Sequence, residues 1–389
     1  MKGKSAHPDR ALRAVVLPPG PRLFEAITRA LAGDGPAVLP LPPSHAAGAL
    51  AALGPTEVET EQGVRQAGGE GVPAGVAVVI ATSGSTGRPK GVQLSATALR
   101  ASAAASLSRL EAAPGERWLC CLPPSHVSGL QVLVRSLLGG TEPIIHERFD
   151  PAAVLASGAA HVSLVPTQLH RLVERGADLS VFRTILLGGA AASPALLERA
   201  GELGARVVTT YGMSETSGGC VYDGRPLDNV DLKIGPDGRI LLAGPVLFAG
   251  YRGGPAFDGG WFTTSDLGEL SGGRLRVLGR ADDVINTGGE KVVAAQVAGV
   301  LAQHPEVADV AVVGRPDAEW GEIVVAVVVP RTPANAPSLA HLRAFAKDRL
   351  PAHAAPRDLR LLPRLPLLPN GKTDLESLRH GTRGHGDAS

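Results

Sequence analysis

The sequence predicts an α/β fold: a large N-terminal domain of β/α layers with a β-hairpin-rich segment, followed by a small mobile α+β C-terminal domain. Three observations predict it. A chain of 389 residues is longer than one hydrophobic core commonly supports, so two domains are expected. From residue 76 onward, short apolar runs typical of strands alternate with stretches of helical spacing, which favours parallel β/α layers. After residue 279 the pattern changes to a short mixture of strands and helices.

The elements of the N-terminal domain follow one another in a regular order. Residues 1–70 are rich in Ala, Gly and Pro and have only a weak pattern. Apolar β-rich runs then predict strands at Val76–Ala81, Trp118–Leu122, His161–Val165, Thr184–Leu187 and Arg206–Thr210. Apolar residues at helical spacing predict helices at Ala96–Leu110, Pro166–Glu174 and Pro194–Leu203.

The later part of the chain predicts a hairpin and then a separate small domain. Val230–Leu242 contains the turn residues Pro-Asp-Gly between two apolar runs, which indicates a hairpin, and a short strand is expected at Arg274–Leu278. Further predicted elements are helices at Ala294–Gln303 and Ser338–Arg349, and strands at Val307–Val313 and Ile323–Val329. We therefore place the domains at residues 1–280 and 281–389, with a frayed tail at the C-terminus.

The composition excludes several classes of function. A net charge of +1 supplies no broad field for nucleic acid or an anionic membrane. No stretch approaches the ~20 apolar residues of a membrane span, and no apolar segment follows the N-terminal lysines, so we expect neither stable membrane insertion nor a secretory signal. The three cysteines have no metal-ligand spacing and are interpreted as buried, reduced thiols of a cytoplasmic protein.

The strongest local motif follows the first predicted strand. The segment Thr82–Gly91, TSGSTGRPKG, combines exposed backbone N–H groups, hydroxyls and a lysine, which suits an anion with many oxygens, such as a polyphosphate. It lacks the final Gly-Lys-Ser/Thr of a Walker A loop. Only seven of the 38 lysines and arginines are lysines, so Lys90 inside this motif is notable. A flexible Gly/Ser turn is the structural alternative.

A second motif, Tyr211–Thr216 (YGMSET), comes directly after the strand at Arg206–Thr210. Ligands of open α/β sheets bind beyond the carboxyl ends of the strands. There, Tyr211 could stack on a purine and Glu215 could hold Mg²⁺ as a hard oxygen ligand. The structural alternative is a helix start, with Ser214 as the cap and Glu215 favouring the helix dipole.

Three weaker motifs lie toward the C-terminus. Asp266, within TTSDLG, lies near a strand end and could accept hydrogen bonds from both ribose hydroxyls, although a turn aspartate is the alternative. The charged, glycine-rich segment from Gly279 to Lys291 lies at the domain boundary, where ordinary linkers have the same composition. Lys372 is presented on an Asn-Gly-Lys turn.

In this order and spacing, the motifs resemble the adenylate-forming superfamily, which includes acyl-CoA synthetases, luciferases and peptide-synthetase adenylation domains. The resemblance extends from Val76 to Leu378 and also includes Gly188–Ala190 and the segment PPSHVSG at residues 123–129. It implies an acid–thiol ligase that uses ATP, Mg²⁺ and CoA and releases AMP and pyrophosphate. The chain departs from the family at Ala294 and Gln296, where a Pro and a Glu are common, and its N-terminal region is short.

The resemblance implies a role for each matching residue in ATP binding. The loop after the first strand would hold the phosphates, the backbone after Gly188 would line the adenine, and Tyr211 would stack on the base. The ATP-binding residues implied in this way are Thr82, Ser83, Gly84, Ser85, Thr86, Gly87, Lys90, Gly188, Gly189, Ala190, Tyr211, Gly212, Asp266 and Arg280.

The implied catalytic residues are Lys372, Glu215, Thr86 and Lys291, with Glu215 as the metal ligand. Lys372 would reach between the carboxylate and the α-phosphate. It would neutralise charge that develops in the transition state, which is where binding energy accelerates a step. The family rotates its C-terminal domain about the linker aspartate, here Asp282, to replace Lys372 by the loop Thr287–Lys291 for thioester formation. The chain has no G-x-S-x-G nucleophile elbow, which argues against a hydrolase.

Within the superfamily, the chain looks most like the compact 2-succinylbenzoate–CoA ligases of menaquinone biosynthesis from high-GC bacteria. The segments that carry this resemblance are residues 210–227, 126–131 and 244–248. The substrate of those enzymes is a dicarboxylate, so a second anion-binding group is expected near the acyl site. The candidates are His126, Ser214, Thr216 and Arg135, and Arg135 could instead be a surface arginine on a helix.

Two other classes of protein compete with this prediction. One is another short aryl- or acyl-CoA ligase, or an acyl-AMP ligase that loads a carrier protein. The other is a non-catalytic nucleotide-binding homologue, which would have no physical reason to retain the dispersed set Lys372, Glu215, Asp266 and Arg280. The expected partners are a small carboxylic acid and CoA, and the resemblance suggests a homodimer.

Overall fold

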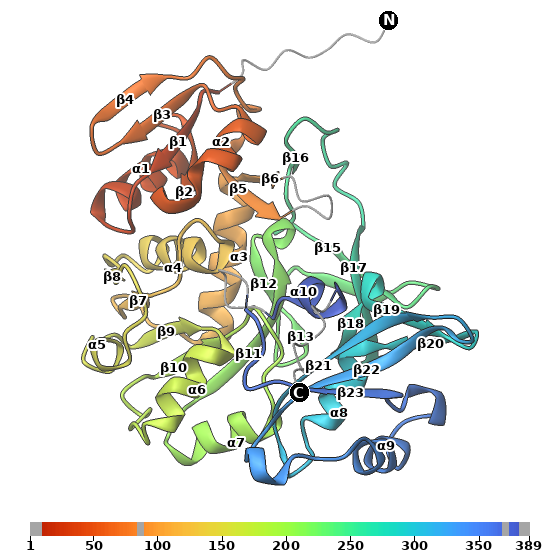
Figure 1. Ribbon diagram of the computed structural model, residues 1–389. Coiled ribbons are helices and arrows are strands. Elements are labelled where there is room, and N and C mark those ends of the chain that lie inside the picture. The colour runs from red at the N-terminus through yellow and green to blue at the C-terminus, as the bar shows by residue number, and fades with distance from the viewer. Residues whose placement is uncertain (1–9, 84–88, 368–372, 381–389) are drawn as a thin grey trace, which may run out of the picture. The chain divides into compact units, whose positions relative to one another are not determined.

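Figure 1 shows the computed structural model of the chain, which describes residues 10–83, 89–367 and 373–380. The chain divides into two compact units. The first comprises Met1–Leu232 and Leu242–Phe262, and the second comprises Lys233–Leu241 and Thr263–Ser389. The division falls ahead of the boundary predicted after residue 280, because the hairpin that ends at Arg280 packs with the C-terminal residues.

The first unit contains two seven-stranded sheets. The first sheet has the order β16 (Gly250–Tyr251), β6 (Pro89–Ser95), β5 (Val76–Ser83), β2 (Ala37–Leu41), β1 (Leu12–Val16), β3 (Glu57–Thr60) and β4 (Gly63–Gln66). Strands β5, β2, β1 and β3 are parallel, and the outer strands pair antiparallel. Helix α1 (Pro21–Ala32), η1 (Pro43–His45) and α2 (Ala46–Leu53) complete this part.

Residues 10–72 are therefore regularly folded, although their sequence pattern is weak. The buried positions of this region include Ala14, Ala37, Ala46 and Ala49. Alanine gives little hydrophobic contrast and no strand preference, so the period of these strands was not visible in the sequence.

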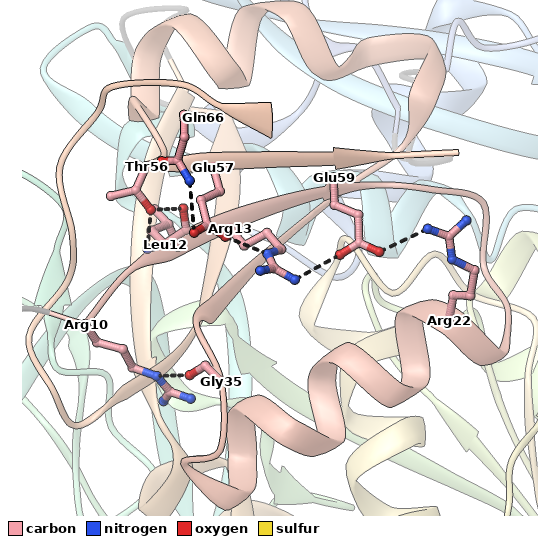
Figure 2. Close-up of polar contacts among 9 residues, drawn as sticks. All are labelled: Arg10, Leu12, Arg13, Arg22, Gly35, Thr56, Glu57, Glu59 and Gln66. Carbon is pink, nitrogen blue, oxygen red and sulfur yellow. Dashed lines mark hydrogen bonds and ion pairs between the residues drawn. The ribbon is translucent and has the colours of Figure 1, made fainter. Parts of the chain in front are cut away.

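Charged side chains pair across β1 and β3, as Figure 2 shows. Arg13 Nε lies 2.8 Å from Glu57 Oε2, its partner across the strand pair. Glu59 lies between two arginines, at 3.4 Å from Arg13 Nη1 and 3.1 Å from Arg22 Nη2. Each partly exposed pair contributes little alone, about 0–1 kcal/mol, but the set favours one alignment of the two strands.

The second sheet carries the predicted β/α layers. Its order is β13 (Arg225–Pro226), β12 (Gly218–Tyr222), β11 (Val207–Met213), β10 (Thr184–Leu187), β9 (His161–Leu164), β7 (Trp118–Cys120) and β8 (Ile144–Ile145). Strands β8, β7, β9, β10 and β11 are parallel, so their carboxyl ends share one edge. The prediction of parallel β/α layers is confirmed.

Helices surround the second sheet (Figure 1). Helices α5 (Pro151–Leu155), α6 (Pro166–Glu174) and α7 (Pro194–Glu202) connect its strands and bury one apolar face with them. Helices α3 (Ala96–Leu110) and α4 (Val127–Leu138) pack on each other, and α3 contacts both β6 and β12. The two sheets of the first unit are thus joined through α3 and α4.

The second unit contains a hairpin sheet and a C-terminal sheet. The first has the order β14 (Asp231–Ile234), β15 (Arg239–Ala243), β17 (Phe262–Ser271) and β18 (Arg274–Arg280). The second has the order β20 (Glu290–Val293), β19 (Val284–Thr287), β22 (Gly321–Pro330) and β21 (Val307–Asp317), with β23 (Asp358–Leu361) on β22. The remaining elements are η3 (Ala281–Asp283), α8 (Ala294–Leu301), η4 (Pro333–Asn335), α9 (Leu339–Lys347), η5 (Ala352–Ala354) and α10 (Leu375–His380).

Strand β22 is buried on both faces. Val324, Ala326 and Val328 pack in the cluster formed with α8 and α9, whereas Val325 and Val327 pack in the cluster that includes Leu378 of α10. Successive side chains of a strand point to opposite faces, so a continuous apolar run here indicates cover on both sides.

Several predicted boundaries were wrong by a few residues. The strand predicted at Trp118–Leu122 ends at Cys120, before the turn that contains Pro123. The strand predicted to end at Thr210 continues to Met213, because its last residues pair antiparallel with β12. Asp266 was predicted near a strand end but lies inside the ten-residue strand β17.

Candidate active site

The phosphate-loop motif joins two antiparallel strands. Thr82 of β5 is the cross-strand partner of Lys90 of β6, and Thr82 Oγ1 lies 3.4 Å from the Lys90 carbonyl oxygen. The motif is therefore a hairpin connection, and strand β6 was absent from the sequence prediction. Lys90 is exposed near the start of β6. The predicted residues Gly84, Ser85, Thr86 and Gly87 lie outside the described residues, and Ser83 is described only as backbone.

Glycines shape the carboxyl edge of the second sheet. A Cβ added to Gly188, which follows β10, would lie 2.5 Å from Thr210 Oγ1 on β11. A Cβ on Gly212 would collide with the carbonyl oxygen of Gly218. Gly189 has φ +84°, in the left-handed region that favours glycine. Only residues without a Cβ allow these two strand ends to lie so close together.

Around this edge, backbone and one aromatic side chain are accessible. Gly189 and Ala190 are exposed and Tyr211 is half-buried. Backbone groups beside an aromatic ring can bind the edge and face of a planar base. The structure thus brings together, within the first unit, the strand ends that the sequence predicted for adenine.

The Glu215 turn is built by Thr216. The Thr216 hydroxyl accepts a hydrogen bond of 2.9 Å from the Met213 N–H and lies 2.6 Å from the Gly218 carbonyl oxygen. Thr216 is fully buried. The buried Thr216 hydroxyl therefore shapes the turn η2 (Ser214–Thr216), and its predicted contact with the substrate stays a prediction.

Tyr251 of β16 holds the Glu215 carboxylate, and sequence reasoning missed it. Its hydroxyl donates a hydrogen bond of 2.8 Å to Glu215 Oε1. Burial first, and then the charge of Glu215, raise the pKa of Tyr251, so the phenol stays protonated and donates. Tyrosine occurs only three times in the chain, and this scarcity could have drawn attention to Tyr251 as well as to Tyr211.

A single carboxylate suits Mg²⁺ that is bound mainly by phosphates. Among the described residues, no group of three or more His, Cys, Asp or Glu side chains could hold a metal ion. Mg²⁺ keeps several waters and commonly uses one or two carboxylates together with substrate phosphates, so Glu215 alone fits this mode.

Helix α4 carries His126 at its N-terminus and is hydrogen-bonded to the residue that follows the turn η2. His126 is the exposed N-cap residue of α4. The buried side chain of Gln131 donates hydrogen bonds from Nε2 to the carbonyl oxygens of Ser217, at 2.7 Å, and Leu99, at 3.3 Å. The helix and the turn after Glu215 are thus held in one fixed relation.

Arg135, on the same helix, is buried and has no carboxylate ion pair among the described residues. Its exposed fraction is 4%. Nη2 donates a hydrogen bond of 2.9 Å to Ser163 Oγ, the guanidinium lies 4.3 Å from the Trp118 ring centroid, and Nε has no partner among the described residues. Burial lowers the pKa of Arg135. The alternative of a surface arginine is therefore wrong.

The remaining predicted residues lie in the second unit. Asp266 of β17 and Arg280 of β18 are cross-strand partners. Burial opposes the charge of Arg280, but a hydrogen bond to Asp282 and the charges of Asp266, Asp282 and Asp283 outweigh it and raise the pKa of Arg280. Asp282 lies in η3, 3.1 Å from Arg280 Nη2.

Lys291 is exposed on β20, beside a tight hairpin. Strands β19 and β20 are joined by Gly288 and Gly289, which have φ of +60° and +84°. Such a two-residue turn requires positive φ and so favours glycine. The predicted loop is thus a hairpin that presents Lys291 to solvent. Lys372 lies outside the described residues.

The chain matches the family model of the AMP-binding enzymes over residues 44–252, and that of the AMP-binding enzyme C-terminal domain over residues 296–372. It belongs to the AMP-binding enzyme family, and with its relatives it is an acid–thiol ligase. The fold class and the resemblance predicted from the sequence are confirmed.

Particular relatives narrow the comparison. The probable 2-succinylbenzoate–CoA ligase of Mycobacterium tuberculosis is 41% identical over 398 residues, covering 97% of this chain and 100% of that protein. The 2-succinylbenzoate–CoA ligase of Bacillus subtilis is 34% identical over 340 residues, covering 79% and 69%. The solved structure of o-succinylbenzoate CoA synthetase (MenE) from Bacillus subtilis with the acyl-adenylate intermediate OSB-AMP has a TM-score of 0.82 at 28% identity, covering 96% and 89%.

The same Bacillus subtilis enzyme has also been solved with ATP and magnesium ion, with a TM-score of 0.80, 29% identity and coverage of 95% and 88%. No helix within the described ranges has the length and apolar character needed to span a membrane.

Proposed function

We propose that this protein converts 2-succinylbenzoate to 2-succinylbenzoyl-CoA, with ATP, as a step of menaquinone biosynthesis. In the first half-reaction, a carboxylate oxygen attacks the α-phosphorus of ATP and pyrophosphate leaves. In the second, the sulfur of CoA attacks the acyl carbon, AMP leaves and the thiol proton is released. The names of the relatives and the adenylate bound to the related Bacillus subtilis enzyme support this reaction.

Residues of the first unit are assigned to the adenine, the phosphates and the metal ion of ATP. Lys90 is assigned to the phosphates, together with the preceding loop. Tyr211 and the backbone of Gly188 and Gly189 are assigned to adenine. Glu215 would hold Mg²⁺, which neutralises phosphate charge when bound. This assignment of Glu215 is supported by the 2.8 Å hydrogen bond from the Tyr251 hydroxyl to Glu215 Oε1.

The second unit supplies the remaining groups. We assign Asp266 and Arg280 to the ribose, Lys372 to the charge that develops at the α-phosphate, and Lys291 to the surface used in thioester formation. Movement about Asp282 would exchange Lys372 for the Thr287–Lys291 hairpin. The exposure of Asp282 and Lys291 in this unit is compatible with that exchange.

Arg135 would select a substrate that has two carboxylates. A buried cation without an opposite charge costs free energy, and an anion that completes it gains charge-assisted hydrogen bonds. Arg135 Nε is buried and has no hydrogen-bond partner among the described residues, so it is an unsatisfied donor. We assign Arg135 to the second carboxylate of the substrate, with His126 and Ser214 beside the acyl chain.

An Arg135→Met variant tests this assignment. The KM for 2-succinylbenzoate should rise at least tenfold, since truncating one partner of a buried charge pair costs about 2–5 kcal/mol. The KM for 4-oxo-4-phenylbutanoate, which lacks the ring carboxylate, should change less than threefold. An equal rise in KM for both acids would show that Arg135 serves packing and would contradict the assignment.

The assembly and compartment are part of the proposal. We propose a homodimer in the cytoplasm. Cys120, Cys121 and Cys220 are buried free thiols, which is compatible with a reducing compartment. Light scattering of the purified protein measures the assembly directly, and a monomeric mass at micromolar concentration would contradict the dimer.

A further inference from the structure

The side chain of Tyr251 is hydrogen-bonded to the carboxylate of the proposed ATP site and lies near its lysine. Its hydroxyl donates a 2.8 Å hydrogen bond to Glu215 Oε1, and Lys90 Nζ lies 5.9 Å from its ring centroid. Lys90 and Glu215 come from distant segments of the first unit, and Tyr251 comes from a third. A single side chain therefore connects the two charged groups.

The position of Tyr251 is fixed by its neighbours. Strand β16 pairs with β6, so that Tyr251 lies opposite Val92, and the Arg252 N–H donates a 2.8 Å hydrogen bond to the Gly91 carbonyl oxygen. The Phe248 ring meets the Tyr251 ring edge-on, at 5.0 Å between centroids. The ring has little freedom to move away from Glu215.

The backbone of the Glu215 turn is held by the same segment. The N–H of Phe248, three residues before Tyr251, donates a 2.9 Å hydrogen bond to the Glu215 carbonyl oxygen. Side chain and backbone of Glu215 thus both bond to residues 248–251. The phenol engages Oε1 and restricts the movement of the carboxylate, and we assign Oε2 to the cation.

We propose that Tyr251 is a positioning residue for the metal-binding carboxylate: it orients Glu215 so that Oε2 meets the cation on the triphosphate, in register with Lys90. The inference rests on the proposed function, in which Glu215 binds Mg²⁺. Hydrogen-bond partners of metal ligands tune affinity, and their loss costs about 10–100-fold in metal affinity or activity.

A Tyr251→Phe variant removes the hydroxyl and keeps the ring. Binding of a non-hydrolysable ATP analogue is titrated by calorimetry with Mg²⁺ and with EDTA, and the Mg²⁺ concentration for half-maximal pyrophosphate release is measured. The Mg²⁺ requirement should rise about tenfold. The metal-free affinity for the analogue should change less than twofold.

Tyr222→Phe is the matched control. Tyr222 is buried, and its hydroxyl also makes one side-chain hydrogen bond, 2.7 Å to Ser106 Oγ. The control loses a comparable bond that does not touch Glu215, so its Mg²⁺ requirement should equal that of the wild type. Thermal unfolding of all variants separates loss of fold from loss of positioning.

A Glu215→Gln variant separates this proposal from the proposed function. In that background, Tyr251→Phe should add no further change to the Mg²⁺ requirement, because the two residues act as one unit. If Glu215→Gln raises the Mg²⁺ requirement and Tyr251→Phe leaves it unchanged, the positioning role of Tyr251 is overturned, whereas the metal site at Glu215 is not. An unchanged requirement in Glu215→Gln overturns the metal site and the positioning role together.

Discussion

Gly188 and Gly212 allow close contacts between neighbouring strands of the second sheet, Gly188 between β10 and β11 and Gly212 between β11 and β12. For Gly212 the obstacle to any larger residue is the Gly218 carbonyl, which cannot turn away without breaking the pairing of β11 and β12. For Gly188 the obstacle is a hydroxyl on the side chain of Thr210. The second case can be relieved by mutation.

Gly188→Ala should destabilise the protein by about 1–3 kcal/mol, because the new Cβ lies 2.5 Å from Thr210 Oγ1. ATP binding should weaken as well. Adding Thr210→Ala removes the oxygen and should restore most of both losses. Gly201→Ala in α7, where no atom lies within 4 Å of the new Cβ, is the control and should be neutral or stabilising. Thermal unfolding and ATP titration check these outcomes, and failure of Thr210→Ala to restore stability would contradict the steric cause.

His161 makes the stability of the first unit depend on pH. Its imidazole is fully buried, stacks on Trp118 at 4.6 Å between centroids, and places Nε2 3.0 Å from Glu116 Oε2. Burial lowers the pKa of His161 from its ordinary value of 6.5, despite the opposing hydrogen bond to Glu116. The charges of Arg183 and Arg135 act in the same direction as burial.

Because the folded pKa is lowered, the unfolded chain takes up the proton first as the pH falls. The stabilising contribution of neutral His161 is therefore present above pH 6.5 and is lost progressively below it. Urea unfolding from pH 7.5 to 5.0 should show this loss in the wild type and a smaller one in His161→Gln. Burial raises the pKa of Glu116, but its hydrogen bonds outweigh burial and lower that pKa from 4.5. The contribution of Glu116 to stability is therefore lost only below pH 4.5. Equal slopes in both proteins between pH 6.5 and 5.0 would contradict the role of His161.

At the scale of elements, the two-residue strand β16 is held by Arg252. Its guanidinium donates to the carbonyl oxygens of Leu53, Gly54, Glu70 and Gly71, three of these bonds measuring 2.7–2.9 Å. Leu53 and Gly54 end helix α2, where carbonyl groups have no partner within the helix. The arginine thus satisfies a helix terminus and anchors the segment that carries Tyr251.

Arg252→Lys should lower the free energy of unfolding by about 1–3 kcal/mol, because an ammonium group cannot reach all four carbonyls and each part-buried hydrogen bond that is lost costs about 0.5–1.5 kcal/mol. Arg199→Lys in α7 is the matched control: Arg199 forms an exposed pair with Glu202 at 2.6 Å, so its replacement should change stability by less than about 0.5 kcal/mol. Thermal unfolding compares the two. A similarly small effect at both positions would show that the hydrogen bonds of the Arg252 guanidinium contribute little to stability.

The elements with a local signal were predictable from the sequence. The helix Pro166–Glu174 and the strand Thr184–Leu187 have their predicted bounds, since a proline begins the first and a glycine ends the second. Strand β6 and helix α4 were not predicted, because β6 is recognisable only by its pairing with β5, and α4 buries its polar residues together with its apolar ones, so they do not mark an exposed face.

The same distinction applies to the site. Glu215 and Lys90 lie in compact motifs and could be selected from residue types and spacing. Tyr251 lies in a two-residue strand and contacts two distant segments, β6 and the Glu215 turn, and so short a strand shows no sequence period. The burial of Arg135 likewise comes from tertiary packing, so the sequence left its alternatives open.

At the scale of the whole molecule, the two half-reactions place different demands on the second unit. If Asp282 is the hinge, Asp282→Pro restricts the movement that brings Lys291 into use while leaving the first arrangement intact. Thioester formation should fall at least tenfold more than adenylate formation. Single-turnover assays of each half-reaction measure the two rates, and an equal loss in both would contradict the exchange of Lys372 for the hairpin.

The central claim is that this acid–thiol ligase activates 2-succinylbenzoate as its adenylate and transfers the acyl group to CoA. The most direct measurement is pyrophosphate release from ATP and Mg²⁺ with a panel of carboxylic acids, with and without CoA, with the thioester identified by mass spectrometry. The account predicts release with 2-succinylbenzoate above the other acids, and a CoA thioester that depends on Lys372. Release with a different acid would contradict the substrate, a thioester formed only on a carrier protein would contradict the acceptor, and no release with any acid would contradict the reaction.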